Sequence, residues 1–193
     1  MDRIDILKLL VKKYQYERFL EVGVRGGYCG YNDIDVPYKD GIEITPGGPA
    51  NFVMSSDEFF EQNRGLKYDL IFIDGDHTYK QSYKDIINAL PYITHNLNSS
   101  ILMHDAFPPS KAYAKEDGGS SGEVWKTIVH LRCTTNLKIY TIDTDYGCAW
   151  IQFDKQELYT KDPLEICLDW DYMQMHKKEL MHLITVKEFK NLL

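Results

Sequence analysis

The chain lacks long hydrophobic runs and paired cysteines. Its apolar stretches, such as residues 70–73, fall far short of the ~20 residues that span a bilayer. Residues 1–14 mix acidic and basic side chains with leucine and do not resemble a signal peptide. The 4 cysteines are widely spaced without a Cys-x-x-Cys pair, which argues against a disulfide scaffold and a zinc cluster. We therefore expect reduced thiols, no membrane span and a cytoplasmic location.

Clustered basic residues are also missing. The sequence has 22 Lys and Arg against 29 Asp and Glu, which gives a formal net charge of −7. Because phosphate backbones are bound by clustered Lys and Arg, this composition predicts no nucleic-acid partner. Tyrosine is plentiful instead, with 14 residues. Its flat apolar face and hydroxyl suit sugar or aromatic substrates, although tyrosines also fill protein cores.

The length of 193 residues fits one domain, and no repeat or linker divides it. We expect a single domain over 1–193, with a leading helix at 1–17, a core at 18–153 and a helical tail at 154–193. An amphipathic helical pattern runs from Asp169 to Leu193. This part of the tail packs either on its own domain or against a second copy, as in a possible homodimer.

Strand and helix patterns alternate along the core. Such alternation predicts an α/β fold, a doubly wound, Rossmann-like sheet that is mostly parallel and has three layers. Residues 108–123 carry Pro, Ser, Gly and charge, and are expected to form a solvated loop or a lid. The expected strands are 18–24, 39–44, 51–54, 68–76, 99–107, 137–143 and 147–153, and the expected helices are 55–64, 79–93 and 123–133.

Four of the first five strands end at an acidic residue: Glu21, Glu43, Asp74 and Asp105. In a doubly wound sheet, ligands bind at the carboxyl ends of the strands. Core packing does not require carboxylates at this rim, whereas a cofactor together with a metal does. An oxygen-rich rim suits Mg²⁺, Mn²⁺ or Ca²⁺ better than zinc.

The glycine-containing loop at residues 19–27, FLEVGVRGG, follows the first strand. It lacks the G-x-G-x-x-G pattern of dinucleotide-binding proteins. Its acid, Glu21, would repel a pyrophosphate but suits a cofactor that carries an ammonium group. About 20 residues further on, Glu43 is placed to accept hydrogen bonds from the ribose hydroxyls of an adenosine cofactor. The simpler interpretation of the loop is an ordinary strand–turn–helix glycine cluster.

The motif IDGDHTY at residues 73–79 carries the strongest chemical signal. Asp74 ends a strand, and His77, at the start of the next helix, is placed to accept a proton from a metal-bound hydroxyl. Alternatively, Asp76 only caps that helix and His77 is a surface residue. Asp105 ends the neighbouring strand and can share a cation with Asp74, while His104 is a ligand, an orienting residue or a structural histidine. The other histidines have no partner spacing and are expected in structural or surface roles: His95, His130, His176 and His182.

From Arg18 to Phe153 these motifs resemble the class I S-adenosylmethionine-dependent methyltransferases. The chain is most similar to the small metal-dependent O-methyltransferases of the catechol, caffeoyl-CoA and macrolide-sugar types. The resemblance implies a seven-stranded sheet whose last strand is antiparallel. It implies that seven residues bind S-adenosylmethionine. Glu21, Gly23 and Gly27 lie beside the amino-acid part of the cofactor, Glu43 binds the ribose, Ser56 and Asp57 lie beside the adenine, and Asp74 is the seventh.

The same resemblance assigns a divalent cation, Mg²⁺ or Mn²⁺, to Asp74, Asp105 and His104, and catalytic roles to Asp74 and His77. The histidine base and the His104-Asp105 pair resemble sugar-modifying members of the class. The predicted function is O-methylation of a sugar hydroxyl in a glycan or glycoside with vicinal hydroxyls. The alternatives are a metal-independent small-molecule methyltransferase, a non-catalytic module that binds S-adenosylmethionine or a nucleotide-sugar, and a nicotinamide-dependent oxidoreductase.

Overall fold

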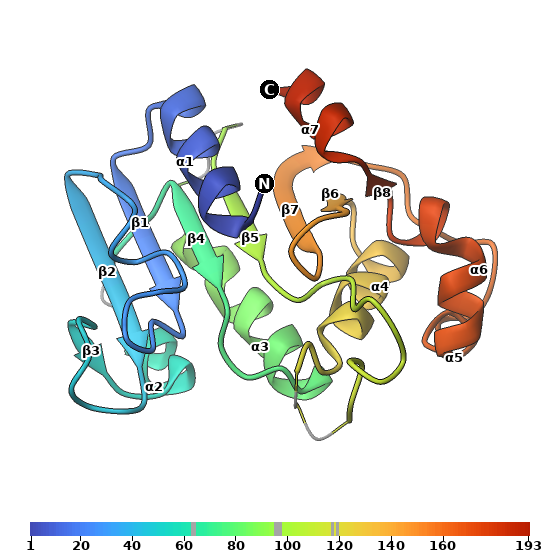
Figure 1. Ribbon diagram of the computed structural model, residues 1–193, viewed down its shortest axis with the longest axis horizontal. Coiled ribbons are helices and arrows are strands. Elements are labelled where there is room, and N and C mark those ends of the chain that lie inside the picture. The colour runs from blue at the N-terminus through green and yellow to red at the C-terminus, as the bar shows by residue number, and fades with distance from the viewer. Residues whose placement is uncertain (63–64, 95–97, 117, 119) are drawn as a thin grey trace.

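The computed structural model describes residues 1–62, 65–94, 98–116, 118 and 120–193. Within these residues one eight-stranded sheet has the order β3-β2-β1-β4-β5-β7-β6-β8 (Figure 1). The strands are β1 (Arg18–Val22), β2 (Tyr38–Glu43), β3 (Phe52–Val53), β4 (Leu70–Ile73), β5 (Ser100–Met103), β6 (Leu137–Ile142), β7 (Cys148–Lys155) and β8 (Leu183–Ile184). The helices are α1 (Arg3–Tyr14), α2 (Ser56–Glu61), α3 (Tyr79–Ala89), the 3₁₀ turn η1 (Leu90–Tyr92), α4 (Val124–Thr134), α5 (Leu164–Cys167), α6 (Trp170–Leu180) and α7 (Val186–Leu192).

The sheet is mostly parallel, as the alternation of strands and helices predicts. Strand β7 is the antiparallel one and pairs with both β5 and β6. The sheet has one strand more than the expected seven strands, and the additional strand is β8. It pairs in parallel with β6 through two residues, Leu183 and Ile184, inside a tail expected to be helical. Two residues are too few to show a strand period, so only the pairing with β6 defines this strand.

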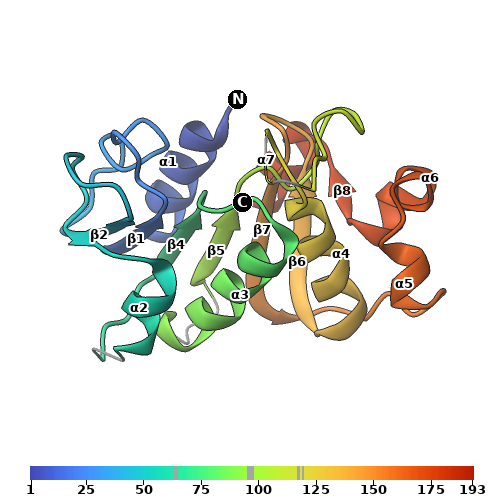
Figure 2. The same ribbon diagram turned by 90° about the horizontal axis from the view of Figure 1, so that it is seen from below.

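Helices cover both faces of the sheet and produce the expected three layers (Figure 2). Strands β4 and β5 are buried along their whole length, which explains their continuous apolar sequences. On one face of the sheet an apolar cluster includes side chains of α1 and α7. On the opposite face a second cluster includes side chains of α2, α3 and α4. The tail packs on its own domain, because Phe189 of α7 is buried edge-to-face against Trp150, with ring centroids 5.5 Å apart.

Two local expectations are corrected by the structure. The glycine loop is followed by a series of turns up to Asp33 and not by the helix that the strand–turn–helix interpretation implies. Helix α3 begins at Tyr79, as the expected range 79–93 has it, because the Thr78 side chain caps it by accepting a hydrogen bond from the Gln81 N–H; His77 therefore precedes the helix and does not start it. His95, residues 63–64 of the expected second helix and residues 117 and 119 of the expected loop lie outside the described part of the chain. No helix in the part that is described is long and apolar enough to cross a membrane.

Candidate active site

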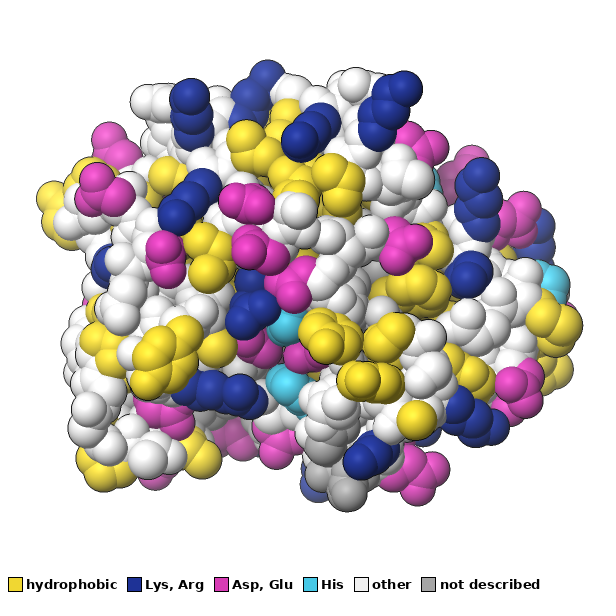
Figure 3. Space-filling view, viewed as in Figure 1, with side chains coloured by type: hydrophobic (Ala, Val, Ile, Leu, Met, Phe, Trp, Pro, Cys, Tyr) yellow, Lys and Arg dark blue, Asp and Glu magenta, His cyan; other side chains and the backbone are white. Residues whose placement is uncertain are grey.

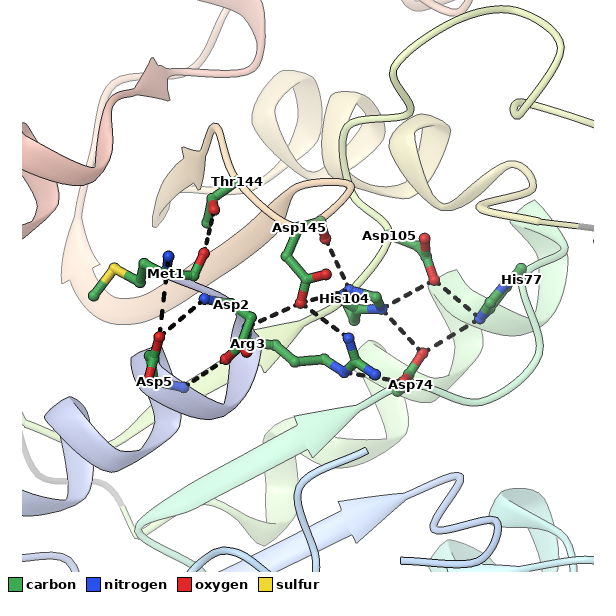
Figure 4. Close-up of polar contacts among 10 residues, drawn as sticks. All are labelled: Met1, Asp2, Arg3, Asp5, Asp74, His77, His104, Asp105, Thr144 and Asp145. Atoms are coloured by element: carbon green, nitrogen blue, oxygen red, sulfur yellow. Dashed lines mark hydrogen bonds and ion pairs between the residues drawn. The ribbon is translucent and has the colours of Figure 1, made fainter. Parts of the chain in front are cut away.

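Four sequence-predicted residues meet at the carboxyl ends of β4 and β5: Asp74, His77, His104 and Asp105 (Figure 4). The parallel register pairs Ile73 with Met103, so the residues that follow these two leave the sheet side by side. All four side chains are buried or nearly so. The side chains expected at the ends of neighbouring strands therefore do lie together at one edge of the sheet.

His77 faces both carboxylates with one ring nitrogen. Its Nδ1 contacts the Ser120 carbonyl oxygen, which only accepts, so Nδ1 carries a proton. Its Nε2 lies 3.4 Å from Asp74 Oδ1 and 3.4 Å from Asp105 Oδ2. That nitrogen is buried and has no partner with hydrogen-bond geometry within the described residues. Burial lowers the pKa of His77, but the carboxylates of Asp74 and Asp105 outweigh burial and raise it above the ordinary value.

His104 uses both ring nitrogens as donors. Its Nδ1 lies 3.0 Å from Asp105 Oδ2 and 3.3 Å from Asp74 Oδ1, and its Nε2 lies 2.8 Å from the Asp145 carbonyl oxygen. Ionised carboxylates and carbonyls only accept, so both nitrogens carry protons and the ring is a cation. Burial lowers the pKa of His104, but hydrogen bonds to Asp105, Asp145 and Asp74 outweigh it and raise the pKa to about 11. The same contact with His104, joined by that with His77, outweighs burial and holds the pKa of Asp74 well below its usual range.

Arg3 and Asp145 complete the cluster, and sequence reasoning missed both. The Arg3 backbone N and Nη1 each lie 2.9 Å from Asp145 Oδ2, and Arg3 Nε lies 3.9 Å from Asp74 Oδ2. Arg3 belongs to an amphipathic helix and Asp145 to a short connection between strands. Because 142 positions separate them, no local pattern links the two.

The turn that carries Asp145 has an unusual backbone. The Gly147 N–H donates to the Thr144 carbonyl at 2.8 Å, and both residues between them, Asp145 and Tyr146, have positive φ, 48° and 60°. A left-handed conformation outside glycine costs about 1–3 kcal/mol for each residue and persists only where surrounding contacts enforce it. Asp105 is also left-handed, with φ 58°. Such conformations concentrate at functional sites, which supports a functional role for this edge.

A cavity of about 470 Å³ lies beside the cluster. Five of the predicted cofactor-binding residues line it: Gly23, Glu43, Ser56, Asp57 and Asp74. Its walls come from the carboxyl ends of β1, β2 and β4, together with α2 and α3, and its volume suits a small-molecule ligand. Asp74 is common to the cavity and the histidine cluster, so the two are one continuous site.

Glu21 and Gly27 are not among the residues that line the cavity. Glu21 is fully buried, and neither carboxylate oxygen has a hydrogen-bond partner within the described part of the chain. A Cβ atom at Gly30 would lie 3.1 Å from its Oε2, so Glu21 lies beneath the turns that follow β1. Burial, together with the charge of Asp74, raises the pKa of Glu21 to about 9.

Glu43 holds the loops at the mouth of the cavity. Its Oε2 accepts a hydrogen bond from the Arg25 backbone N at 2.7 Å, and its Oε1 accepts one from the Thr45 backbone N at 3.0 Å. A carboxylate offers about four acceptor positions, so two remain for ligand hydroxyls. The carboxylate is therefore oriented by its neighbours before any ligand binds.

Asp85 is a further cavity residue that the sequence did not single out. It accepts hydrogen bonds from Ser56 Oγ at 2.6 Å and from Gln81 Nε2 at 2.9 Å. Burial raises its pKa to about 6. Asp57 behaves oppositely, because its hydrogen bond with Lys84 at 2.6 Å lowers its pKa. Asp85 occupies a position on the buried face of α3, where sequence periodicity predicts an apolar residue.

The expected loop at 108–123 packs against His77. The Glu123 N–H donates to the His77 carbonyl at 2.7 Å, and a Cβ at Gly122 would lie 2.3 Å from that oxygen. The loop also supplies Tyr113, whose ring lies 5.8 Å from that of Tyr146, and both are exposed. Figure 3 shows hydrophobic side chains next to the histidines in the central hollow, with acidic and basic side chains around them.

Residues 42–106 match the family model of a methyltransferase domain, which is 65 of 193 residues. The matched segment includes Asp74, His77, His104 and Asp105 of the histidine cluster and part of the cavity lining, whereas Val22, Gly23 and Arg25 of that lining precede it. Among curated proteins, no sequence matches this chain.

Solved structures show the same fold. A candidate caffeoyl-CoA O-methyltransferase from Staphylococcus aureus superimposes with a TM-score of 0.60 and 18% identity, over 79% of this chain and 84% of that one. The methyltransferase PaMTH1 of Podospora anserina, bound to S-adenosylhomocysteine (SAH), has a TM-score of 0.58 and 15% identity, over 78% and 77%. The MycE methyltransferase of the mycinamycin pathway, in complex with Mg and SAH, has a TM-score of 0.51 and 16% identity, over 90% of this chain and 55% of that one. The expected class I methyltransferase fold is confirmed, and the match of residues 42–106 to the methyltransferase-domain model agrees with it.

Proposed function

We propose that the chain is an S-adenosylmethionine-dependent O-methyltransferase that uses a divalent cation, Mg²⁺ or Mn²⁺, to activate an acceptor hydroxyl. The observation that carries the proposal is the convergence of Asp74, His77 and Asp105, whose ligand atoms all lie within 4.8 Å of one another. The donor set fits a cation, because Asp74 and Asp105 offer carboxylate oxygens, the ligands that Mg²⁺ and Mn²⁺ prefer, and His77 Nε2 beside them has no hydrogen-bond partner within the described residues. A bound cation lowers the pKa of a coordinated hydroxyl.

In this proposal Asp74 and Asp105 hold the cation and His77 is the general base. The ring of His77 is oriented by the Nδ1 contact with Ser120, which leaves Nε2 to accept the hydroxyl proton. His104, predicted as a possible ligand, acts as an orienting residue, because both of its nitrogens already donate hydrogen bonds. The lone pair that a ligand needs is therefore missing from its ring.

The adjoining cavity is the proposed site of S-adenosylmethionine. Glu43 has acceptor positions for the ribose hydroxyls, and Ser56 and Asp57 lie at the proposed adenine end. Because Asp74 belongs to both parts of the site, the cofactor and the acceptor oxygen are held next to each other, which is the main contribution of positioning to such a reaction. Cofactor binding by Glu21 and Gly27 stays a prediction, since neither residue lines the cavity.

The acceptor is proposed to be a sugar hydroxyl of a glycan or glycoside with a vicinal hydroxyl. The exposed faces of Tyr113 and Tyr146 support this, since aromatic faces pack against the C–H faces of sugar rings and their hydroxyls bond to ring substituents. The MycE structure, with Mg and SAH bound, is a fold relative that supports the pairing of cation and cofactor.

Calorimetric titration tests the proposal. The protein is titrated with SAH in EDTA, and then with candidate sugars in the presence and absence of Mg²⁺ or Mn²⁺. Asp105→Asn is the matched variant, because Asp105 does not line the cavity and Asn tolerates its left-handed backbone. We expect SAH binding with and without metal, and sugar binding only with metal and only in the unmodified protein.

Absence of SAH binding would refute the methyltransferase proposal. Metal-independent sugar binding and turnover would identify a metal-independent methyltransferase instead. SAH binding without any turnover, for every acceptor and metal tried, would support a non-catalytic binding module.

A further inference from the structure

We propose that Arg3 and Asp145 are positioning residues of the cation site. They fix the ring of His104, and His104 in turn holds the carboxylates of Asp74 and Asp105 toward the base. The inference rests on the proposed function, because it assigns the supports of that same site. It makes the first turn of α1 and the β6–β7 turn parts of the active site, although both are remote from it in sequence.

The β6–β7 turn is joined to the segment that carries His104 and Asp105. The Phe107 N–H donates to the Tyr146 carbonyl at 2.8 Å, and the Ala106 N–H donates to the Gly147 carbonyl at 3.0 Å. A Cβ at Gly147 would lie 2.2 Å from Phe107 N, so only glycine permits this approach. These contacts place the Asp145 carbonyl and carboxylate against His104 Nε2, at 2.8 and 3.4 Å.

The amino-terminal end of the chain holds the turn from the other side. The Arg3 backbone N and Nη1 share one oxygen of Asp145, so main chain and side chain act on the same carboxylate. The Thr144 hydroxyl also donates to the Met1 carbonyl oxygen. Three separate contacts therefore connect the first residues of the chain to this one turn (Figure 4).

The charges at this edge explain why Asp145 matters to a cation. Three carboxylates, Asp74, Asp105 and Asp145, face two cationic side chains, Arg3 and His104. Asp145 pairs with Arg3 and so keeps this guanidinium, whose Nε lies 3.9 Å from Asp74 Oδ2, from competing with the cation for Asp74. Arg3 in turn fixes the Asp145 carboxylate against His104.

The test compares three variants of the full chain. Asp145→Asn removes the charge and keeps a side chain that tolerates positive φ. Arg3→Gln removes the positively charged guanidinium from the same contact with Asp145. Lys8→Gln is the matched control, because it removes an exposed α1 ion pair with Asp33, 3.1 Å long, that lies outside the cluster. Mn²⁺ affinity, SAH affinity and melting temperature are measured for each.

We expect Asp145→Asn and Arg3→Gln to weaken Mn²⁺ binding about 10- to 100-fold, the usual effect of losing a residue that orients metal ligands. SAH affinity should stay unchanged, and Lys8→Gln should match the unmodified protein in every measurement. The double variant should bind Mn²⁺ no more weakly than the worse single variant, since both residues act through one contact.

Unchanged Mn²⁺ affinity in both variants would overturn the inference while leaving the proposed function intact. Joint loss of Mn²⁺ binding, SAH binding and thermal stability would also overturn it, because the residues would then support the fold in general. An unmodified protein that binds SAH but no Mn²⁺ would refute the cation itself, and with it both proposals.

Discussion

Replacing Asp85 with Asn changes one buried carboxyl group in the wall of the cavity. Asp85 is almost fully buried and accepts hydrogen bonds from Ser56 and Gln81 through the same oxygen, Oδ1. An Asn side chain retains that acceptor, so both hydrogen bonds survive. The substitution therefore removes the ability to ionise and little else.

The size and sign of the effect follow from the raised pKa. Burial raises the pKa of Asp85 from 3.8 to about 6, so the folded protein keeps a proton that the unfolded chain releases near pH 4. The free energy of unfolding consequently falls as the pH rises through this window, by up to about 3 kcal/mol in total, at 1.36 kcal/mol for each pKa unit. The Asn variant escapes this loss, because it has no proton to release.

Urea unfolding at a series of pH values measures the difference. Asp85→Asn should match the unmodified protein at about pH 4 and exceed it by up to about 3 kcal/mol at about pH 8. For a chain of this size the gain corresponds to about 6–12 °C in melting temperature.

Asp57→Asn serves as the control of opposite sign. Its hydrogen bond with Lys84 lowers the pKa of Asp57, so its contribution to stability is present above the unfolded pKa and is lost as the pH falls. This control should show no gain at about pH 8 and lose less than about 1 kcal/mol there. A stability difference between Asp85→Asn and the unmodified protein that stays the same at both ends of the pH range would refute the reasoning about Asp85.

Three further predictions concern the reaction. Asp74→Ala should abolish turnover and Mn²⁺ binding while circular dichroism shows a retained fold; measurable Mn²⁺-dependent turnover would remove Asp74 from the cation site. His77→Ala should lower kcat about 10²- to 10⁴-fold, the range for a positioned base, and a loss of only a few-fold in steady-state assays would exclude that role. Glu43→Gln should weaken SAH binding about 10- to 100-fold in calorimetry, because hydrogen bonds to a charged acceptor are worth about 1.5–3 kcal/mol. Unchanged SAH affinity would show that Glu43 does not hold the ribose.

The fold class and the position of the site were predictable from local patterns. Short buried strands at 70–73 and 100–103 are continuous apolar runs, and helix patterns separate the strands along the chain. Parallel strands end at one edge, so Asp74 and Asp105 were expected to meet, and they do. The helical pattern at the end of the chain concealed β8, because a two-residue strand has no period of its own.

Other parts of the site depend on contacts that no local pattern contains. Successive side chains of a strand alternate between faces, so Glu21 shares a face with Phe19 and not with Val22, which lines the cavity. Which of the two faces borders the cavity is decided by the helices that cover each of them. The sequence therefore placed Glu21 at the correct edge without showing that α1 and the following turns cover it.

By itself the sequence determined the order of most strands and helices, the acidic edge and the class of fold, since each depends on residues close together in the chain. The tertiary structure alone decided that His104 donates from both ring nitrogens, that Asp85 is buried and that Arg3 reaches Asp145. The physical reason is distance along the chain. Arg3 and Asp145 are 142 positions apart, and only the packing of α1 against the sheet and the strained β6–β7 turn brings them within 2.9 Å.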